Sequence, residues 1–255
     1  AKDIMADNSD VMFFCISWEV KGDNVISYFV RMYQARYLSG IIAGMTTKTG
    51  KIGYVAAMPN NEGNRGINAF TLGVRSVNKE AKVYVDFSGE WDNEEKERAA
   101  TDELYNIGCD LFTCHQNRNF VSEEADKLGA YSIGYHVKPD TCSDKNLTAV
   151  TGRWDNVYDA LIKYGEGTAL GYVDSWPGIA EEAVGLADYS NLVSDEAKSK
   201  VQEFKERICG SMDVFCNEIK DSDGNLRSSE GERISDDELL NGMDWFVYGV
   251  EIYEQ

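Results

Sequence analysis

The amino-acid sequence predicts an α/β fold built on a parallel, doubly wound sheet. Short apolar runs recur along the first half of the chain at a spacing of roughly 20–30 residues, and a helical segment lies between each pair. Only three prolines occur, and no low-complexity linker divides the 255 residues. Strands that alternate with helices form right-handed βαβ units, so we expect neighbouring strands to be parallel.

Individual elements fit their places in this pattern. The apolar run 11–16 is continuous, as expected of a strand covered on both faces. Gly40 and Gly44 share one face of the helix predicted for 30–46 and would allow close packing against a neighbour. The acidic first turn of the helix predicted for 93–106 complements the helix dipole. In chain order, the expected strands are 11–16, 51–57, 82–87, 110–114, 131–135 and 147–151, with a further element at 168–173; the expected helices are 30–46, one from about Gly63, 93–106, 120–128, 155–165 and 194–209; and a turn is expected at 221–224.

The charge balance disfavours several classes of partner. The formal net charge is −19, from 44 acidic and 25 basic residues. Such a field repels phosphate backbones and anionic lipid, so we expect no nucleic-acid or membrane-surface role. Solubility is the simplest explanation of the acidity, and attraction of a cationic ligand is the alternative. No run approaches the roughly 20 apolar residues that span a bilayer, and the first residues lack the pattern of a signal peptide.

The cysteines and histidines do not form a metal-binding pattern. No CxxC pair occurs, and His115 and His136 are the only histidines, so we expect no structural zinc, no other metal and no cofactor. Cys209 and Cys216 flank a predicted turn and could meet, although reduced thiols are the preferred interpretation. The six cysteines are Cys15, Cys109, Cys114, Cys142, Cys209 and Cys216.

Known catalytic patterns are absent as well. There is no Gly-x-Ser-x-Gly elbow, and 48–51 lacks the spacing of a phosphate loop. The segment 221–225 has the wrong ligand order for calcium and is better interpreted as a turn. Cys114 and His115 are adjacent on a predicted strand and point to opposite faces, so they cannot form a thiolate–imidazole pair. We therefore expect a protein that is not an enzyme.

Ligands of parallel sheets bind beyond the carboxyl ends of the strands, where loops and helix N-termini converge. Here that rule selects the loops 58–62, 88–92, 115–117 and the residue after the next strand, 136. An aromatic face with side-chain amides suits a flat heterocycle with a polar edge, although a Trp or His at a strand end is as often a capped core residue. The candidate ligand-binding residues in these loops are Asn60, Trp91, His115, Gln116, Asn117 and His136.

Several motifs resemble those of the basic-membrane-protein family. They are RMYQARYLSGIIAGMTTKTGKIGYVAAMP (31–59), RGINAFTLGVRSVN (65–78), Trp91-Asp92 with the acidic helix after it, and SDDELLNGMDWFVYGV (235–250), and the similarity runs from about 10 to 248. Members of that family are extracytoplasmic solute-binding lipoproteins of ABC importers, and many bind purine nucleosides or bases. The resemblance implies a type I periplasmic-binding fold, in which two α/β lobes joined by crossing segments close on a solute.

On this resemblance, residues 1–27 and 152–255 form the first lobe and 28–151 the second, with crossings near 24–28 and 147–151. A complete family member places about two further βα units before Ala1. We therefore expect the first lobe to be incomplete, with apolar sheet surface that needs covering. Self-association over this lobe is one way to cover it.

The resemblance also bears on the ligand. Nucleoside binders of the family hold ribose with an aspartate and a lysine, and His136 and Gly152 stand at those two places here, with Arg153 and Trp154 beside Gly152. Sites built to bind hydroxyls lose much affinity when those contacts are missing. Other members recognise a free purine base, a use that suits Trp91, Trp154 and Gln116.

The sequence thus predicts the solute-binding component of an ABC importer for a purine nucleoside, a purine base or a similar heterocycle. We expect it to bind in the interlobe cleft, close by a hinge and deliver its cargo to a permease without covalent chemistry. An N-terminal lipidated cysteine, which is not present in this chain, would tether the mature protein outside the membrane. We expect a cell-surface lipoprotein or a periplasmic protein. The alternative is a regulatory or scaffold protein whose cleft has degraded, and an enzyme acting on nucleosides ranks third.

Overall fold

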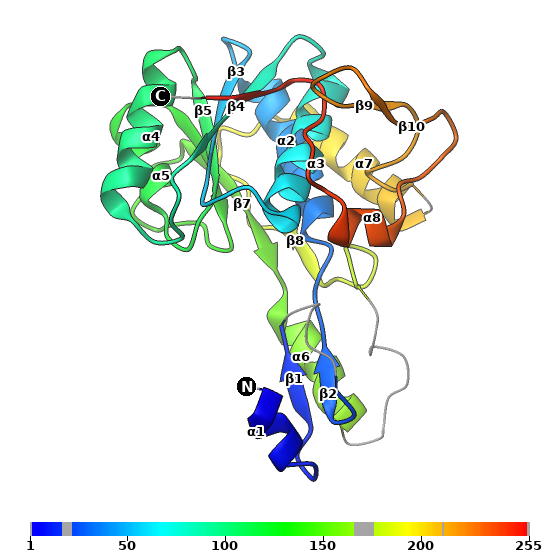
Figure 1. Ribbon diagram of the computed structural model, residues 1–255. Coiled ribbons are helices and arrows are strands. Elements are labelled where there is room, and N and C mark those ends of the chain that lie inside the picture. The colour runs from blue at the N-terminus through cyan, green and yellow to red at the C-terminus, as the bar shows by residue number, and fades with distance from the viewer. Residues whose placement is uncertain (1, 17–21, 166–175, 211, 254–255) are drawn as a thin grey trace. The chain divides into compact units, whose positions relative to one another are not determined.

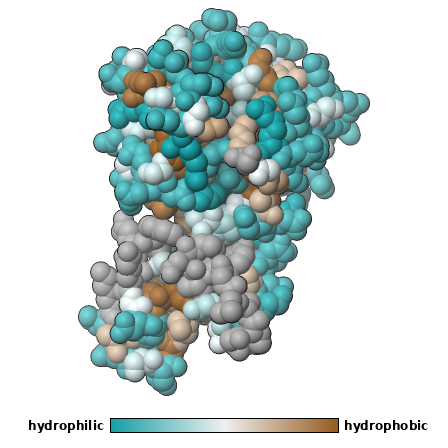
Figure 2. Space-filling model, turned by 90° about the vertical axis from the view of Figure 1, so that its right-hand side faces the viewer, coloured by the Kyte–Doolittle hydropathy of each residue, from teal (hydrophilic) through white to brown (hydrophobic). Residues whose placement is uncertain are grey.

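The computed structural model describes residues 2–16, 22–165, 176–210 and 212–253, which form two compact units (Figure 1). The small unit contains residues 1–32 and 152–185, and the large unit contains 33–151 and 186–255. No helix in the described part of the chain is both long and apolar enough to cross a membrane. In Figure 2 the face over the large unit is mostly hydrophilic, in keeping with the strongly acidic composition.

The large unit is organised around a seven-stranded sheet with the order β11-β4-β3-β5-β6-β7-β8. Helices α4 and α5 cover one face of the sheet, and α2 and α3 lie on the other (Figure 1). Every neighbouring pair from β11 to β7 is parallel, so the predicted α/β fold class is confirmed. The strands are β3 (Lys51–Ala56), β4 (Lys82–Phe87), β5 (Leu111–His115), β6 (Tyr131–Tyr135), β7 (Asn146–Gly152), β8 (Val184–Leu186) and β11 (Val250–Ile252); the helices are α2 (Met32–Thr46), α3 (Asn61–Val77), α4 (Glu94–Asn106), α5 (Phe120–Lys127), α7 (Asp195–Gly210) and α8 (Asp236–Asn241); and β9 (Ile219–Lys220) pairs with β10 (Leu226–Ser228).

The small unit contains α1 (Lys2–Asp7), β1 (Phe13–Cys15), β2 (Val25–Ser27) and α6 (Trp154–Gly165). Strands β1 and β2 pair in parallel as a two-stranded sheet. The expectation that 11–16 is covered on both faces is wrong: Val11 and Met12 are 45% exposed and Ile16 is 51% exposed. The residues of β1 itself are only half-buried.

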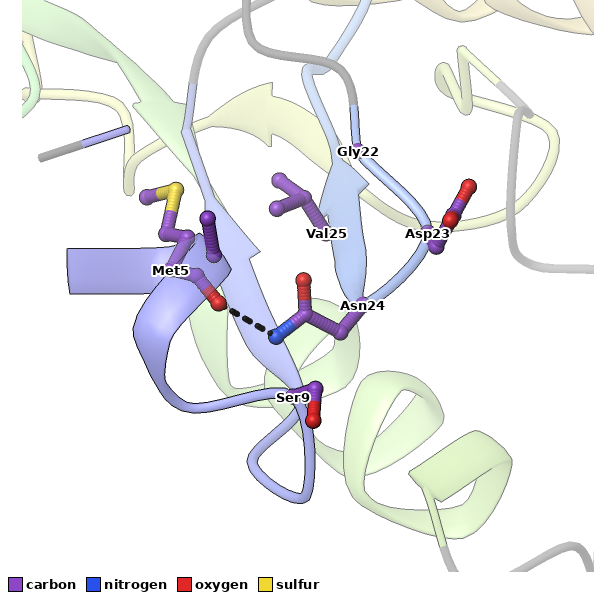
Figure 3. A pocket seen from close by; sticks show the side chains of 7 residues that line it. Met5, Ser9, Gly22, Asp23, Asn24 and Val25 are labelled. Atoms are coloured by element: carbon purple, nitrogen blue, oxygen red, sulfur yellow. Dashed lines mark hydrogen bonds between the residues drawn. The ribbon is translucent and has the colours of Figure 1, made fainter. Parts of the chain in front are cut away.

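The small unit also holds a pocket of about 400 Å³ (Figure 3). One of its walls is closed by the Asn24 side chain, whose Nδ2 donates to the carbonyls of Met5, Asn8 and Val11 at 2.9 Å each. The side chain of Asp23 points away from Asn24 and Val25 in Figure 3. These amide contacts connect α1 to the loop before β2, so Asn24 serves the local fold. The pocket is lined by Met5, Ala6, Ser9, Gly22, Asp23, Asn24 and Val25.

Helices α2 and α3 of the large unit touch backbone to backbone. A Cβ on Gly40 would lie 2.1 Å from the Phe70 carbonyl oxygen, and a Cβ on Gly73 would lie 2.0 Å from that of Tyr37. Gly44 makes a third such approach, 2.6 Å from the Val74 carbonyl oxygen. Real side chains do not fit at these distances, so glycine is required on both helices. The predicted close packing through Gly40 and Gly44 is confirmed, and its partner is α3.

The polar side of α3 holds the C-terminal segment 239–247. Asn68 donates through Nδ2 to the Trp245 carbonyl at 2.9 Å and accepts from the Val247 amide at 2.9 Å. One turn earlier, Asn64 donates to the Met243 carbonyl at 2.9 Å. Both asparagines are buried, and buried backbone groups need partners. The segment 235–250, which the sequence analysis singled out, is therefore held against α3 by these hydrogen bonds, and we call it the C-terminal strap.

Most element boundaries match the sequence predictions to within two residues, and the expected element at 168–173 lies outside the described residues. The turn at 221–224 is present: Asp221 accepts from the Asp223 and Asn225 amides at 3.0 and 2.8 Å and from Arg227 Nε at 2.8 Å.

The lobe boundaries remain a prediction. The compact units differ from them in one respect, since 186–255 packs with 33–151, where β11 pairs with β4.

A buried carboxyl lies in the first turn of α4. Glu97 is fully buried, and its Oε1 accepts from the Asn93 amide at 3.3 Å. Burial raises the pKa of Glu97 to about 7, and nearby Asp92 and Glu94 add to the effect, while the Asn93 amide and Arg98 oppose it. The folded protein therefore keeps a proton that the unfolded chain releases near pH 4.5.

Substituting Gly73→Ala is expected to lower the free energy of unfolding by about 3 kcal/mol or more, because α2 and α3 must separate to admit the methyl group. The control is Gly210→Ala at the end of α7, where no atom lies within 4 Å of the added Cβ. Urea unfolding of both variants measures the difference. Equal stabilities would show that the helix contact is not tight.

Glu97→Gln is expected to flatten the dependence of stability on pH. The stabilisation linked to Glu97 is fully present below pH 4.5 and is lost as the pH rises through about 7. A glutamine keeps the acceptor for the Asn93 amide but cannot ionise, so the variant should gain stability relative to the wild type between pH 5 and pH 8. Urea unfolding at the two pH values measures this gain, and exposed Glu95→Gln on the same helix should show none.

Candidate functional site

The strands β3 to β6 are parallel, so their carboxyl ends meet at one edge of the large unit. Four rings lie in sequence along this edge, and we call them the aromatic row: Trp91, His115, Tyr135 and His136. Neighbouring ring centroids are 5.7, 4.6 and 4.0 Å apart. Trp91 is half-buried, whereas His115 is only 4% exposed. The row therefore offers aromatic surface at its two ends and a buried centre.

A buried arginine from α2 lies beneath the centre of the row. Arg36 is 1% exposed and donates through Nη1 to Thr113 Oγ1 at 3.2 Å and through Nη2 to the Cys114 carbonyl at 2.7 Å. Its guanidinium lies 4.1 Å from the centroid of the Tyr135 ring and 5.3 Å from that of Tyr54. Neutral acceptors and ring faces thus hold this cation, and its field reaches the histidines.

His115 connects the buried centre to a carboxylate. Its Nε2 is 3.3 Å from Tyr135 Oη and 3.7 Å from Glu62 Oε1, and the Glu62 side chain is 41% exposed. Burial lowers the pKa of His115 and Arg36 lowers it further, against the opposing effect of Glu62. Burial would raise the pKa of Glu62, but the His115 contact and nearby positive charge outweigh it and the net shift is downward. At neutral pH the pair is a neutral imidazole beside a carboxylate.

His136 closes the row on an unusual backbone conformation. Its φ is +60°, in the left-handed region, and its amide donates to the Val150 carbonyl at 2.7 Å. Burial of the ring against Tyr135 lowers the pKa of His136, and the charge of Arg36 lowers it further. His136 therefore also stands as a neutral imidazole, at an exposed position of the edge.

Three buried polar atoms without a protein partner converge on the open face of Gly66 in α3: Arg36 Nε, Tyr54 Oη and His115 Nδ1. A Cβ at Gly66 would lie 3.5 Å from Tyr54 Oη, 3.6 Å from His115 Nδ1 and 3.9 Å from Arg36 Nε. Buried polar atoms need hydrogen-bond partners, and the missing side chain leaves room for water to reach them. The absence of a side chain at Gly66 thus leaves space for water beside the buried centre of the row.

Two of the predicted polar residues use their side chains within the fold. Gln116 is 2% exposed and donates through Nε2 to Ser88 Oγ at 2.7 Å. Asn60 is the N-cap of α3 and accepts from the Gly63 amide at 2.8 Å. Asn117 is exposed, and its amide donates to the Trp91 carbonyl at 3.0 Å. The structure therefore brings Trp91, His115 and His136 together, with Asn117 beside Trp91.

Arg153 and Trp154 belong to the small unit, and their part in a shared site stays a prediction. Trp154 stacks on Tyr158 at 6.1 Å between centroids. A Cβ on Gly152 would lie 2.8 Å from two atoms of the Trp154 indole. A side chain at 152 would therefore require the Trp154 indole to shift. Arg153 is exposed, and its amide donates to the Ala183 carbonyl at 2.8 Å.

Sequence reasoning missed Arg36, Glu62 and Tyr135. Arg36 had a usable signal, since it is the one charged residue in α2, and a lone charge in an otherwise uncharged helix needs a buried partner or a functional role. Glu62 lies in a loop that the strand-end rule selected, but nothing in the sequence separates it from other acidic residues. No metal-binding cluster occurs among the described residues. All six cysteines are free, and only Cys109 and Cys114 are buried.

Comparison with known proteins adds independent evidence. The family described as "ABC transporter substrate-binding protein PnrA-like" (Bmp) matches residues 1–218. A purine-binding protein of Brucella abortus is 32% identical over 249 residues, which cover 95% of this chain and 69% of the relative. A Haloferax volcanii protein named for glucose binding in an ABC transporter is 30% identical over 250 residues, covering 97% of this chain and 61% of the relative. A CD4+ T-cell-stimulating antigen of Listeria monocytogenes is 27% identical over 208 residues, with 73% and 58% covered.

Solved structures show the same fold. A transcriptional activator of the comK gene from Bacillus halodurans superposes with a TM-score of 0.74 and 25% identity, covering 82% of this chain and 74% of that chain. An ABC transporter solute-binding protein from Aeropyrum pernix superposes with a TM-score of 0.66 and 19% identity, covering 81% and 71%. Solute-binding proteins of the type I periplasmic fold are thus its structural neighbours.

Gly66→Ala is expected to destabilise the protein by about 1–2 kcal/mol, because the methyl group shields three buried polar atoms from water. Sterically the methyl group fits, since 3.5 Å is an ordinary contact distance, and alanine favours a helix over glycine by about 1 kcal/mol. Urea unfolding measures the balance, with Gly210→Ala as the control for helix propensity. A gain in stability at residue 66 would show that these atoms need no hydration.

Proposed function

The chain belongs to the PnrA-like (Bmp) family of ABC transporter substrate-binding proteins, and from that membership we propose that it carries a purine base to an importer. Substrate-binding proteins of ABC transporters are extracytoplasmic and are not enzymes. The proposal includes a role of this chain in transport and a permease that receives the cargo. It also includes a lipid anchor that holds the protein outside the membrane. The purine-binding relative in Brucella abortus supports the choice of cargo.

The observation that carries the proposal is the aromatic row with a carboxylate beside it. Trp91 gives a half-buried ring on which a flat heterocycle can stack. Glu62 and two neutral histidines supply hydrogen-bonding groups at the same edge. A purine base has the matching chemistry, an apolar face with polar edges.

A free base fits this chain better than a nucleoside. Ribose binders of the family use an aspartate and a lysine, and this chain has His136 and Gly152 in their places. Trp154 leaves no room for a side chain at 152, so a lysine cannot stand there without moving the indole. With both ribose partners replaced, the hydroxyls of a nucleoside would lose their hydrogen bonds.

One observation favours a rival role. A neighbour of 25% sequence identity is titled a transcriptional activator, which fits a regulatory or scaffold protein that does not transport. The two roles differ in their response to ligands. A solute that binds the folded state alone must raise the melting temperature, so no shift with any purine base would favour the regulatory role.

Titration calorimetry with adenine, guanine, hypoxanthine and their nucleosides tests the proposal. We expect a base to bind more tightly than its nucleoside, and Trp91→Ala to weaken that binding about tenfold or more, since stacking on an aromatic ring contributes about 1–3 kcal/mol per base. Tyr105→Ala, an exposed aromatic at the far end of α4, should leave the affinity unchanged. Tighter nucleoside binding would contradict the free-base proposal, and an unaffected Trp91→Ala variant would contradict the stacking role.

A further inference from the structure

We propose that Glu62 selects the cargo by accepting hydrogen bonds from two adjacent N–H groups of the base, so that guanine is preferred among the purine bases. The inference rests on the proposed function, because it requires that a purine base binds at the aromatic row. It goes beyond that function by naming the edge of the base that is recognised and the residue that recognises it.

Glu62 has the position and the accessibility that such a residue needs. It lies in the first turn of α3, 3.7 Å from His115 in the middle of the row, and its side chain remains 41% exposed. Two other polar candidates at this edge, Gln116 and Asn60, are less available. Gln116 is buried and bound to Ser88, and the Asn60 oxygen caps α3.

The buried charge of Arg36 favours the tautomer of His115 whose proton faces Glu62. Arg36 Nε and His115 Nδ1 both approach the open face of Gly66, at 3.9 and 3.6 Å from the Cβ position. A guanidinium N–H can only donate, and its positive charge favours a lone pair on Nδ1. The single proton of the neutral imidazole then stands on Nε2, which faces Glu62 and Tyr135. His115 is therefore a positioning residue that orients the carboxylate.

A carboxylate held in this state sets the chemistry of its ligand. It accepts hydrogen bonds and donates none, so the edge of the base that meets it must carry donors. Guanine presents N1–H and N2–H₂ side by side, which matches the two carboxylate oxygens. Adenine places an unprotonated N1 beside its amino group, and the N1 lone pair would face a carboxylate oxygen. Sites built on polar complementarity reject such mismatches strongly.

A glutamine at 62 would reverse the match. Its amide has one acceptor and one donor group, which pair with the N6 amine and N1 of adenine respectively. The same amide loses one of the two contacts with guanine, because its NH₂ group meets a donor. Glu62→Gln should therefore change the order of preference, which general damage to the site would not do.

The experiment is an equilibrium titration of wild type, Glu62→Gln and Glu62→Asp with guanine, adenine and 1-methylguanine, which lacks N1–H. We expect wild type to bind guanine at least tenfold more tightly than either other base, and Glu62→Gln to shift the guanine-to-adenine ratio at least tenfold towards adenine. Glu62→Asp should keep the guanine preference at lower affinity. Glu95→Gln, at an exposed position on α4, should match wild type.

The outcomes separate this inference from the function on which it rests. Binding of purine bases with an unchanged ratio in Glu62→Gln would overturn the role of Glu62 alone. Equal binding of guanine and 1-methylguanine by wild type would do the same. If wild type binds no purine base, the proposed function itself fails. Should Glu62→Gln not fold, the methylated base and Glu62→Asp still test the inference.

Discussion

The backbone contact between α2 and α3 is the constraint on which the rest of the large unit depends. Gly40 and Gly44 on one helix and Gly73 on the other let carbonyl groups approach to distances that no side chain would allow. Arg36 lies one turn before Gly40, and Gly66 lies two turns before Gly73. Close crossing therefore brings the guanidinium, the open face of Gly66 and the strand-end histidine together. α3 also fastens the C-terminal strap through Asn64 and Asn68.

Burying Arg36 is costly, because a desolvated cation needs full compensation. The protein offsets this cost with the Thr113 hydroxyl, the Cys114 carbonyl and two aromatic ring faces. Burial lowers the pKa of His115 and His136 most, and the positive charge of Arg36 lowers it further. A neutral imidazole can donate from one nitrogen and accept at the other, which suits recognition of a polar heterocycle better than a second cation would. Arg36 thus adds to the electrostatics of the site without needing to touch the ligand.

Family membership and cargo depend on different parts of the chain. The motifs 31–59 and 65–78 encode β3, α3 and their packing with α2, which any member needs to fold. Relatives of similar identity are nevertheless named for purine and for glucose, so shared packing residues do not decide the ligand. In the function proposed for this chain, the choice of ligand falls to side chains at the strand ends, such as Trp91 and Glu62. At Gly152 in the small unit, an added side chain would meet the Trp154 indole.

The sequence by itself predicted the strands and helices from α2 to α6, the parallel sheet and the family, and it suggested the edge at which a ligand would bind. These follow from local periodicity and short motifs, which depend on neighbours along the chain. Only the tertiary structure decided which polar side chains at that edge remain available. Gln116 donates its amide N–H to Ser88 and the Asn60 oxygen caps α3, whereas Arg36 and Glu62 flank His115 from two different helices. The Asn60 cap is local, but the contacts of Gln116, Arg36 and Glu62 join residues far apart in sequence, and no local pattern records how α2 and α3 cross.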